Sequence, residues 1–243
     1  PGEHTLRCAT LDGRRATGVR LGTGEEIPAA LVVSNADSAW TYRHLLPEQV
    51  RRRWTNRRIE RKKYSMGCFL WYFGTRERFP RVAQHTILLG PRYRGLLDDI
   101  FERKVLADDF SLYLHRPTAT DPSLAPSGAD TFYALSPVPN LEADVDWKKR
   151  AEPYRQAICK YLEQTVLPGL SDRLTVSHLA TPDDFLARTR SFHGAAFGLQ
   201  PVLTQSAYFR PHNRFQEIDG CYLVGGGTHP GSGLPTIYES GRI

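Results

Sequence analysis

The sequence predicts a mixed α/β fold, in which strands alternate with helices and irregular segments. Three patterns support this. A short apolar run at 31–33 ends in polar turn residues, and a helix-like segment follows at 38–46. Between 147 and 167, apolar side chains recur at steps of three and four residues, the spacing of an amphipathic helix. The strand-like segment 221–225 runs into glycines and then into Pro235, which suits the first turn of a helix.

Composition and charge restrict the classes of protein. The chain has 243 residues, 40% hydrophobic and 24% charged, enough for one large or two ordinary domains. The net charge of +6 leaves nucleic acid, a membrane surface or a phosphate-bearing cofactor open as partners. The four cysteines form no C-x-x-C pair, which argues against a zinc knuckle or a disulfide framework and favours a reducing cytoplasm. No run of about twenty apolar residues predicts a membrane-spanning helix, so any membrane contact must be peripheral.

The remaining elements follow from local patterns. A β-meander is expected at the start, with strands at 4–11 and 17–22 around a tight Asp12-Gly13 turn, and 31–33 is expected to be a buried strand. Further strands are predicted within 64–75, 85–90, 108–115, 130–138 and 174–180, with a loop at 117–128 and a short helix capped by Thr181. The segment 191–209 carries no formal charge but contains glycines and a proline, which is more typical of a cavity wall than of a membrane span.

A basic run at 51–63 is the strongest charge feature. It contains eight Lys or Arg residues and a single glutamate, with Trp54 and Ile59 interleaved. It is interpreted either as a peripheral helix that contacts anionic lipid or as a solvated helix face. The candidates for substrate or membrane contact are Arg51, Arg52, Arg53, Trp54, Phe197 and Phe209.

The glycine-rich turn at 224–235 is the strongest candidate for a ligand site. Its glycines can adopt positive φ and let backbone N–H groups approach a ligand, and a helix N-terminus suits an anionic or electron-rich group. It is neither a Walker loop nor a dinucleotide fingerprint in its usual place, and tight packing alone is the alternative. His229 is a weak candidate catalytic residue or a residue that stabilises the turn. Asp37 either contacts a ligand or begins a helix, and Arg210 either lines the mouth of a cavity or pairs with a surface carboxylate.

Four stretches of the sequence resemble the C-terminal half of bacterial phytoene desaturase, a family of FAD-dependent carotenoid desaturases. They are VVSNAD (32–37), FSLYLHRPTATDPSLAPSG (110–128), PVLTQSAYFRPHNR (201–214) and YLVGGGTHPGSGLP (222–235). The similarity covers nearly the whole chain in matching order. Among the glycine-turn positions, Gly226, Ser232 and Thr236 depart from the family's more usual residues, which leaves the number of desaturation steps open.

The resemblance implies a flavoprotein fold of the p-hydroxybenzoate-hydroxylase-like or amine-oxidase-like type with an inserted domain. Residues 1–40 and 206–243 would be parts of the FAD-binding domain, and 41–205 would form the substrate-binding, membrane-facing domain. The first glycine fingerprint and most of the pyrophosphate site would lie in a half that is not present. The implied cofactor-binding residues are Ser34, Asn35, Ala36, Asp37, Gly225, Gly227, Thr228, Gly231, Gly233, Leu234 and Pro235.

The resemblance also implies a reaction. Phytoene or a related C40 polyene would lose a hydride to FAD and a proton, which creates a new double bond. Carotenoid isomerases, ketolases and saturases share the scaffold and remain alternatives. A basic nucleic-acid-binding module is an alternative of another class, although no signature of a nucleic-acid-binding fold is present. We expect no metal, no nucleic-acid partner and a cytoplasmic location at the membrane periphery. The isolated chain should be inactive and hold flavin poorly.

Overall fold

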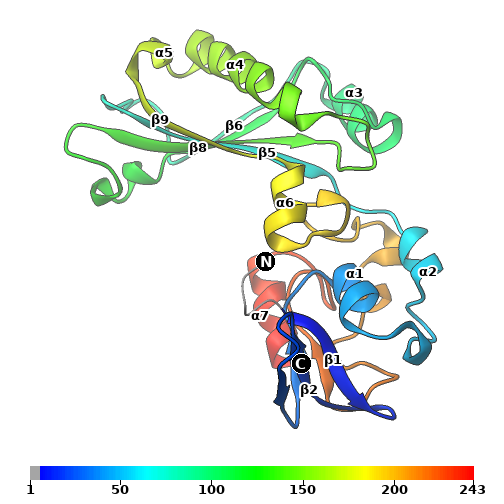
Figure 1. Ribbon diagram of the computed structural model, residues 1–243. Coiled ribbons are helices and arrows are strands. Elements are labelled where there is room, and N and C mark those ends of the chain that lie inside the picture. Colours follow the sequence, from blue (N-terminus) through cyan, green and yellow to red (C-terminus); the bar gives the residue numbers. More distant parts are fainter. Residues whose placement is uncertain (1–5) are drawn as a thin grey trace. The chain divides into compact units, whose positions relative to one another are not determined.

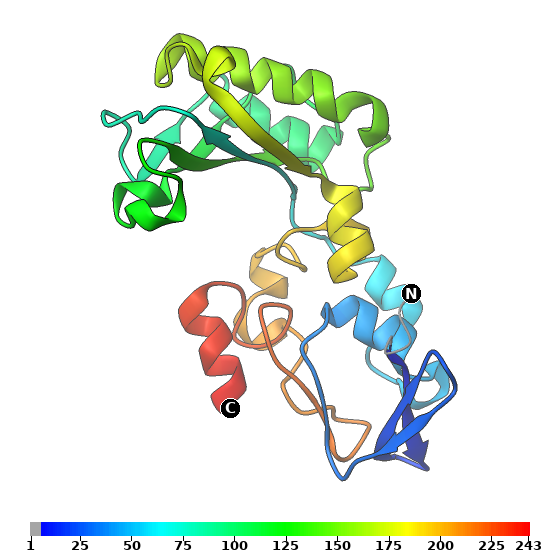
Figure 2. The same ribbon diagram turned by 60° about the vertical axis from the view of Figure 1, so that its left-hand side comes forward.

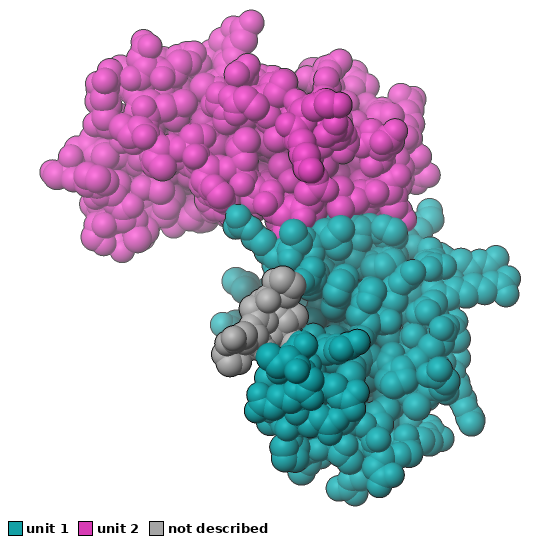
Figure 3. All heavy atoms as spheres, in the orientation of Figure 1, with its two compact units in different colours: residues 1–65, 186–243 teal, residues 66–185 magenta. Residues whose placement is uncertain are grey.

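The computed structural model describes residues 6–243 and divides into two compact units (Figures 1 and 3). Unit 1 contains residues 1–65 and 186–243, and unit 2 contains residues 66–185. The predicted inserted domain, 41–205, is longer at both ends. Residues 41–65 and 186–205 belong to unit 1 because they share its core, as the pairing of Tyr64 with Leu199 illustrates.

Unit 1 opens with an antiparallel sheet in the order β1-β2-β3. Its strands are β1 (Leu6–Asp12), β2 (Arg15–Leu21) and β3 (Glu26–Pro28). The tight turn between β1 and β2 lies where the sequence predicts it, with Gly13 at a φ of 57°. Residues 4 and 5 of the predicted first strand lie outside the described residues.

A parallel strand pair follows, formed by β4 (Val32–Ser34) and β10 (Cys221–Leu223). Cys221 lies opposite Val32, and Leu223 lies opposite Ser34. The expectation that 31–33 is buried was wrong: Leu31 is 61% exposed and Val33 is 59% exposed. Side chains alternate between the two faces of a strand. Val32 therefore packs against the core of unit 1, whereas its neighbours point away from it.

The helices of unit 1 are short. They are α1 (Ser38–Trp40), which continues as the π-helix η1 (Thr41–Leu45), then η2 (Glu48–Val50), α2 (Asn56–Glu60), and α7 (Leu234–Arg242). Single 3₁₀ turns occur at η6 (Phe192–Gly194), η7 (Leu203–Gln205) and η8 (Ala207–Phe209). The core beneath them gathers aromatic residues from both chain segments, including Tyr42, Trp54, Tyr64, Phe192 and Phe215.

Unit 2 is a five-stranded antiparallel sheet in the order β6-β7-β8-β5-β9. Its strands are β5 (Gly67–Thr75), β6 (His85–Leu88), β7 (Leu112–His115), β8 (Asp130–Val138) and β9 (Leu174–Ala180). The predicted strands are therefore confirmed, with the same bounds for β8 and β9. The loop at 117–128 contains two 3₁₀ turns, η4 (Pro117–Ala119) and η5 (Pro122–Leu124).

The long helix α4 (Trp147–Thr165) lies over one face of this sheet (Figures 1 and 2). Its apolar side packs Tyr154, Ile158 and Leu162 against Phe69 and Leu112 of the sheet. The other helices are α3 (Tyr93–Asp98), the π-helix η3 (Asp99–Arg103), α5 (Leu170–Arg173) and α6 (Pro182–Thr189), which crosses the boundary between the units.

A buried polar network fixes one end of the sheet. Asp130, at the start of β8, accepts hydrogen bonds from the Phe79 amide at 2.7 Å and from the Thr118 hydroxyl at 2.7 Å. The Arg116 guanidinium lies 3.3 Å from the same carboxylate and donates to the Phe79 carbonyl at 2.6 Å. The Asp130 carboxylate therefore joins the 79–82 and 116–118 loops to β8. Because the ion pair with Arg116 is buried, the loss of either partner would leave an uncompensated charge in the interior.

Candidate functional site

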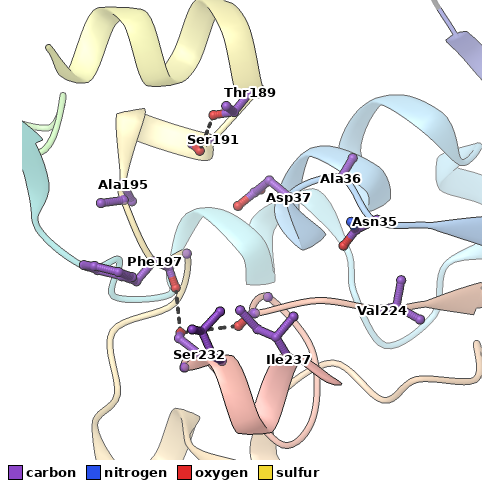
Figure 4. Close-up of a pocket in the computed structure, with 16 residues that line it drawn as sticks. Asn35, Ala36, Asp37, Thr189, Ser191, Ala195, Phe197, Val224, Ser232 and Ile237 are labelled. Carbon is purple, nitrogen blue, oxygen red and sulfur yellow. Dashed lines mark hydrogen bonds between the residues drawn. The ribbon is translucent and has the colours of Figure 1, made fainter. Parts of the chain in front are cut away.

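The parallel pairing of β4 and β10 brings the two predicted ligand loops together. The carboxyl ends of parallel strands meet at one edge of a sheet, so Ser34-Asn35-Ala36-Asp37 and Val224-Gly225-Gly226-Gly227 become neighbours. The pairing continues beyond β10, where the Val224 amide donates to the Ser34 carbonyl at 3.0 Å. A cavity of about 440 Å³ lies at this edge (Figure 4). This volume is within the usual range for small-molecule sites, about 300–1,000 Å³.

Six of the eleven predicted cofactor residues line this cavity: Asn35, Ala36, Asp37, Gly227, Gly233 and Leu234. Phe197, predicted to contact substrate or membrane, lines it as well. The other lining residues were not among the predicted ligand contacts, and they are Thr189, Ser191, Ala195, Ala196, Gly198, Val224, Gly226, Ser232 and Ile237. Several of them fall within 191–209, so the prediction of a cavity wall there agrees with the structure.

The remaining cofactor candidates support the loops instead of lining the cavity. Ser34 forms a 2.8 Å hydrogen bond with the Thr41 hydroxyl, and Thr228 is buried and donates to the Pro211 carbonyl at 2.6 Å. Gly231 lies against Arg210, and Pro235 lies in the first turn of α7. The Gly225 amide donates to the Ser240 hydroxyl at 2.8 Å.

At two glycines a side chain would crowd residues of the facing loop. Gly225 has a φ of +100°, and a Cβ built there would overlap with the Asn35 side-chain oxygen. At Gly227, a Cβ would lie 3.0 Å from the Ser38 hydroxyl and 3.2 Å from the Ser38 amide nitrogen. Gly225 therefore serves only the packing of the two loops, whereas Gly227 packs against Ser38 and also presents its backbone to the cavity.

Arg210 differs from both of its predicted roles. Only 3% of it is exposed, and it donates to the Gly226 carbonyl at 2.8 Å and to the Leu199 carbonyl at 3.0 Å. Burial lowers the pKa of this guanidinium. Arg210 thus connects the glycine turn to the 195–200 segment. Its partners are backbone carbonyls, whereas a surface carboxylate was expected.

The start of α7 is as predicted. Gly233 precedes the helix, accepts from the Ile237 amide at 2.9 Å and from the Thr236 hydroxyl at 2.8 Å, and lines the cavity together with Leu234. The first N–H groups of a helix have no partner within the helix and carry a partial positive charge. Therefore this wall of the cavity favours an electron-rich or anionic group.

Asp37 is the titratable side chain among the cavity-lining residues. It caps α1 by accepting from the Trp40 amide at 2.9 Å, so the predicted helix entry is present in the structure. Burial raises the pKa of this carboxyl. Figure 4 shows its side chain directed toward the loop that carries Ser191 and Ala195. Asp37 therefore both caps a helix and faces the cavity.

His229 lies elsewhere. Its imidazole lines a second cavity of about 670 Å³ together with His212, and its amide donates to the Pro211 carbonyl at 2.9 Å. Its position in the sequence motif suggests a catalytic group, but the chain turns at Thr228 and carries the side chain away from the first cavity.

The basic run does not form one peripheral helix. Arg51 is buried and donates to the Trp54 carbonyl at 2.8 Å and to the Asn56 side chain at 3.0 Å. Trp54 is 5% exposed and stacks on Tyr42 at 5.4 Å between ring centroids. Their proposed contact with a membrane is corrected, because both belong to the core. Arg52 is exposed, and the partly buried Arg53 donates to Gln216 at 2.8 Å.

Phe209, the last of these candidates, is exposed at the end of η8. Within residues 6–243, no helix is long and apolar enough to cross a membrane. The same described residues contain no group of three or more His, Cys, Asp or Glu placed to hold a metal ion.

The fold defines a class of protein. An oxidoreductase from Methanosarcina mazei matches 96% of this chain and 46% of its own, with a TM-score of 0.59 and 16% identity. A redesigned putrescine oxidase matches 98% of this chain and 47% of its own, with a TM-score of 0.57 and 13% identity. The cyclohexylamine oxidase of Brevibacterium oxydans matches 97% of this chain and 45% of its own, with a TM-score of 0.51 and 10% identity. At these identities the likeness establishes the fold alone, and it confirms the predicted amine-oxidase-like fold.

The sequence relatives are carotenoid desaturases. The neurosporene-forming phytoene desaturase of Rhodobacter capsulatus is 50% identical over 96% of this chain and 45% of its own length. The lycopene-forming phytoene desaturase of Pantoea ananas is 44% identical over 95% of this chain and 47% of its own length. No family model matches the chain. The chain is homologous along nearly its whole length to bacterial phytoene desaturases, as the sequence motifs predict, and it spans about half the length of these relatives.

Proposed function

We propose that this chain forms part of an FAD-dependent carotenoid desaturase that dehydrogenates phytoene or a related C40 polyene. The observation that carries the proposal is the cavity at the β4–β10 edge, where the two loops of the family motif meet. The homology to phytoene desaturases supplies the substrate class.

The residues around the cavity fit a flavin ring. Gly226, Gly227 and Gly233 present backbone with no side chain, and the first turn of α7 presents N–H groups with a partial positive charge. Bound oxidised flavin would supply a hydride acceptor, and its reduced form carries negative charge. The backbone N–H groups of Gly233 and Leu234 would stabilise that charge without any titrating side chain.

The apolar wall of the same cavity fits a hydrocarbon. Ala195, Ala196, Phe197, Val224 and Ile237 offer methyl, methylene and aromatic surface, and the buried Arg210 holds the loops that carry them. These side chains would orient the polyene and exclude water from the reacting carbons.

Unit 2 offers a second surface suited to a long conjugated ligand. On the sheet face opposite α4, a chain of neighbouring aromatic rings takes one residue from each of the five strands. In the order β6-β7-β8-β5-β9, these residues are His85, His115, Tyr133, Tyr72 and His178. A cavity of about 510 Å³ lies at its β5–β9 end. Flat rings in series can stack on an extended π-system. We therefore place polyene binding by unit 2 on this face.

Reconstitution tests the proposed function. The chain is produced together with the part of the Rhodobacter capsulatus desaturase that it does not match, supplied with FAD and mixed with phytoene in vesicles. We expect about one FAD per assembled protein and new absorption bands of longer conjugated polyenes. Each part alone is the control. Stoichiometric FAD on this chain alone would contradict the expectation that most of the FAD-binding site lies outside this chain. An assembly that binds FAD without desaturating phytoene would contradict the proposed reaction.

We also propose that unit 1 contacts an anionic membrane surface. Leu203, Tyr208 and Phe209 project from η7 and η8, and Leu203 is 85% exposed. The side chain of Gln205, on the same segment, donates to the Lys63 carbonyl at 2.8 Å and accepts from the Lys63 amide at 3.1 Å. An apolar loop therefore lies next to the end of the basic run. An apolar tip beside cations is the composition of a peripheral lipid-binding site.

Vesicle sedimentation tests this contact. In the assembled protein, Leu203→Glu combined with Phe209→Glu should lower binding to vesicles with 30% anionic lipid by about tenfold or more, because each change removes apolar area and adds repulsion. Leu124→Glu combined with Tyr93→Glu, which changes exposed apolar residues of unit 2, is the matched control. Equal binding by both double variants would place the lipid contact elsewhere.

A further inference from the structure

One side chain that lines the cavity at the β4–β10 edge can accept a proton near neutral pH, and it is the carboxylate of Asp37. The cavity lining consists of apolar side chains, glycines, hydroxyl groups, the Asn35 carboxamide and one carboxyl group, that of Asp37. Neither hydroxyl nor carboxamide groups accept a proton readily near neutral pH. The imidazole of His229 lies in a different cavity.

We propose that Asp37 is the base that accepts the proton lost in the desaturation step. The inference rests on the proposed function. A saturated pair of carbons becomes a double bond when one carbon gives a hydride, with two electrons, to oxidised flavin. The adjacent carbon gives a proton to the Asp37 carboxylate, and the electron pair of that C–H bond becomes the second carbon–carbon bond.

The local structure suits this role. The α1 cap uses Oδ1 of Asp37, which accepts from the Trp40 amide, and this bond fixes the direction of the carboxyl group. On the other side, a Cβ built at Gly198 would lie 3.7 Å from Oδ2, so any side chain at this position would pack against that oxygen. Glycine at position 198 leaves the space beside Oδ2 to a ligand. Burial makes the charged form costly and outweighs the backbone hydrogen bonds from Trp40, Phe192 and Ala39 that favour it, so the pKa is raised and the carboxylate is a stronger base.

Asp37→Asn is a clean test because asparagine caps helices as well as aspartate does. It preserves shape and capping and removes only the ability to take a proton. In the assembled, FAD-loaded protein we expect desaturation to slow by about 10²–10⁴-fold, the usual contribution of a general base. FAD content should equal that of the wild type. Asp37→Glu should recover part of the rate, and the wild-type rate should rise with pH where the Asn variant is flat.

The matched control is Asp121→Asn. Asp121 also caps a turn, accepting from the Ser123 amide at 3.0 Å, but it is exposed and lies in unit 2. Its replacement should leave the rate unchanged. An Asp37→Asn variant that binds FAD normally and desaturates within threefold of the wild type at every pH would overturn the assignment.

A second measurement needs neither cofactor nor substrate. The folded chain holds the Asp37 proton more tightly than the unfolded chain, because burial raises the pKa of this carboxyl. The stability of the wild type relative to Asp37→Asn should therefore fall as pH rises from the ordinary aspartate range, about 3.9, through the raised pKa. Urea unfolding of both proteins between pH 4 and 8 measures this difference.

The two readouts separate the two claims. If the wild-type assembly binds no FAD, the proposed function fails, and the urea series alone decides on the proton affinity of Asp37. A stability difference that is independent of pH would overturn the base assignment even if the assembly desaturates phytoene.

Discussion

Gly225 and Gly24 have nearly the same φ angle and different surroundings. Their φ angles are +100° and +94°, so a side chain is strained at either position. A Cβ at Gly24 would meet nothing within 4 Å, whereas at Gly225 it would overlap with Asn35. The pair therefore separates the cost of the conformation from the cost of the contact between the two ligand loops.

We expect Gly24→Ala to lower the free energy of unfolding by about 1 kcal/mol through backbone strain. Gly225→Ala should cost about 0.5–1.5 kcal/mol more, because the Asn35 side chain must also rotate away from the new methyl group. Urea denaturation of both variants measures the difference. Combining Gly225→Ala with Asn35→Gly should recover most of the additional loss, and equal losses for the two alanine variants would mean that the loops do not touch at this point.

At the scale of residues, the sequence indicated which loops form the site but not which side chains face the cavity. The motif itself pointed to Asn35, Asp37 and Leu234. It could not show that Thr228 turns inward to a carbonyl or that His229 faces a different cavity, because these outcomes depend on contacts with Pro211, far from the motif in the sequence. Both roles predicted for Arg210 were wrong for the same reason, since its partners are backbone carbonyls that leave no pattern in the sequence.

At the scale of elements, Asp130 connects the start of β8 to the neighbouring loops through buried hydrogen bonds and an ion pair. Replacing Asp130 with alanine would leave Arg116 buried without its carboxylate and would remove the acceptor of the Phe79 amide. We expect a loss of about 3–5 kcal/mol in the free energy of unfolding, the usual cost of breaking a buried pair. Thermal and urea unfolding measure it.

Asp121→Ala is the control, because Asp121 is an exposed capping residue of the neighbouring turn and should cost about 1 kcal/mol. If the two substitutions had similar effects, the buried network would contribute little to the stability of the sheet.

Elements with a strong local pattern were predicted well. Alternation in β8 and helical periodicity in α4 depend on neighbours in the sequence, and both elements have nearly the predicted bounds. The apolar run at 31–33 and the basic run at 51–63 were misjudged, because burial there is decided by distant segments. Val33 has no covering layer within the described chain, whereas Trp54 is buried and stacks on Tyr42, which in turn packs against Phe215.

For the molecule as a whole, unit 2 has the features of an independently folding domain. It has its own core, and its ends lie together: Gly67 opens β5 close to the ring of Pro182, which follows β9. We expect residues 66–185, produced alone, to unfold in one cooperative transition with a near-ultraviolet circular dichroism signal from its packed aromatic residues. The Asp130→Ala variant of this piece should unfold at lower temperature. A piece without a cooperative transition would show that its stability depends on unit 1.

The pairing of β4 with β10 also has a consequence during synthesis. Ser34 leaves the ribosome roughly 190 residues before its partner Leu223, which is a delay on the order of 10–40 s at about 5–20 residues per second. Unit 2 lies entirely within this interval and can fold while β4 waits for β10, whose Cys221 and Leu223 belong to the core on which Val32 packs. The ligand site is therefore among the last parts of the chain to form, and a chaperone that shields apolar strands would have its longest opportunity at β4.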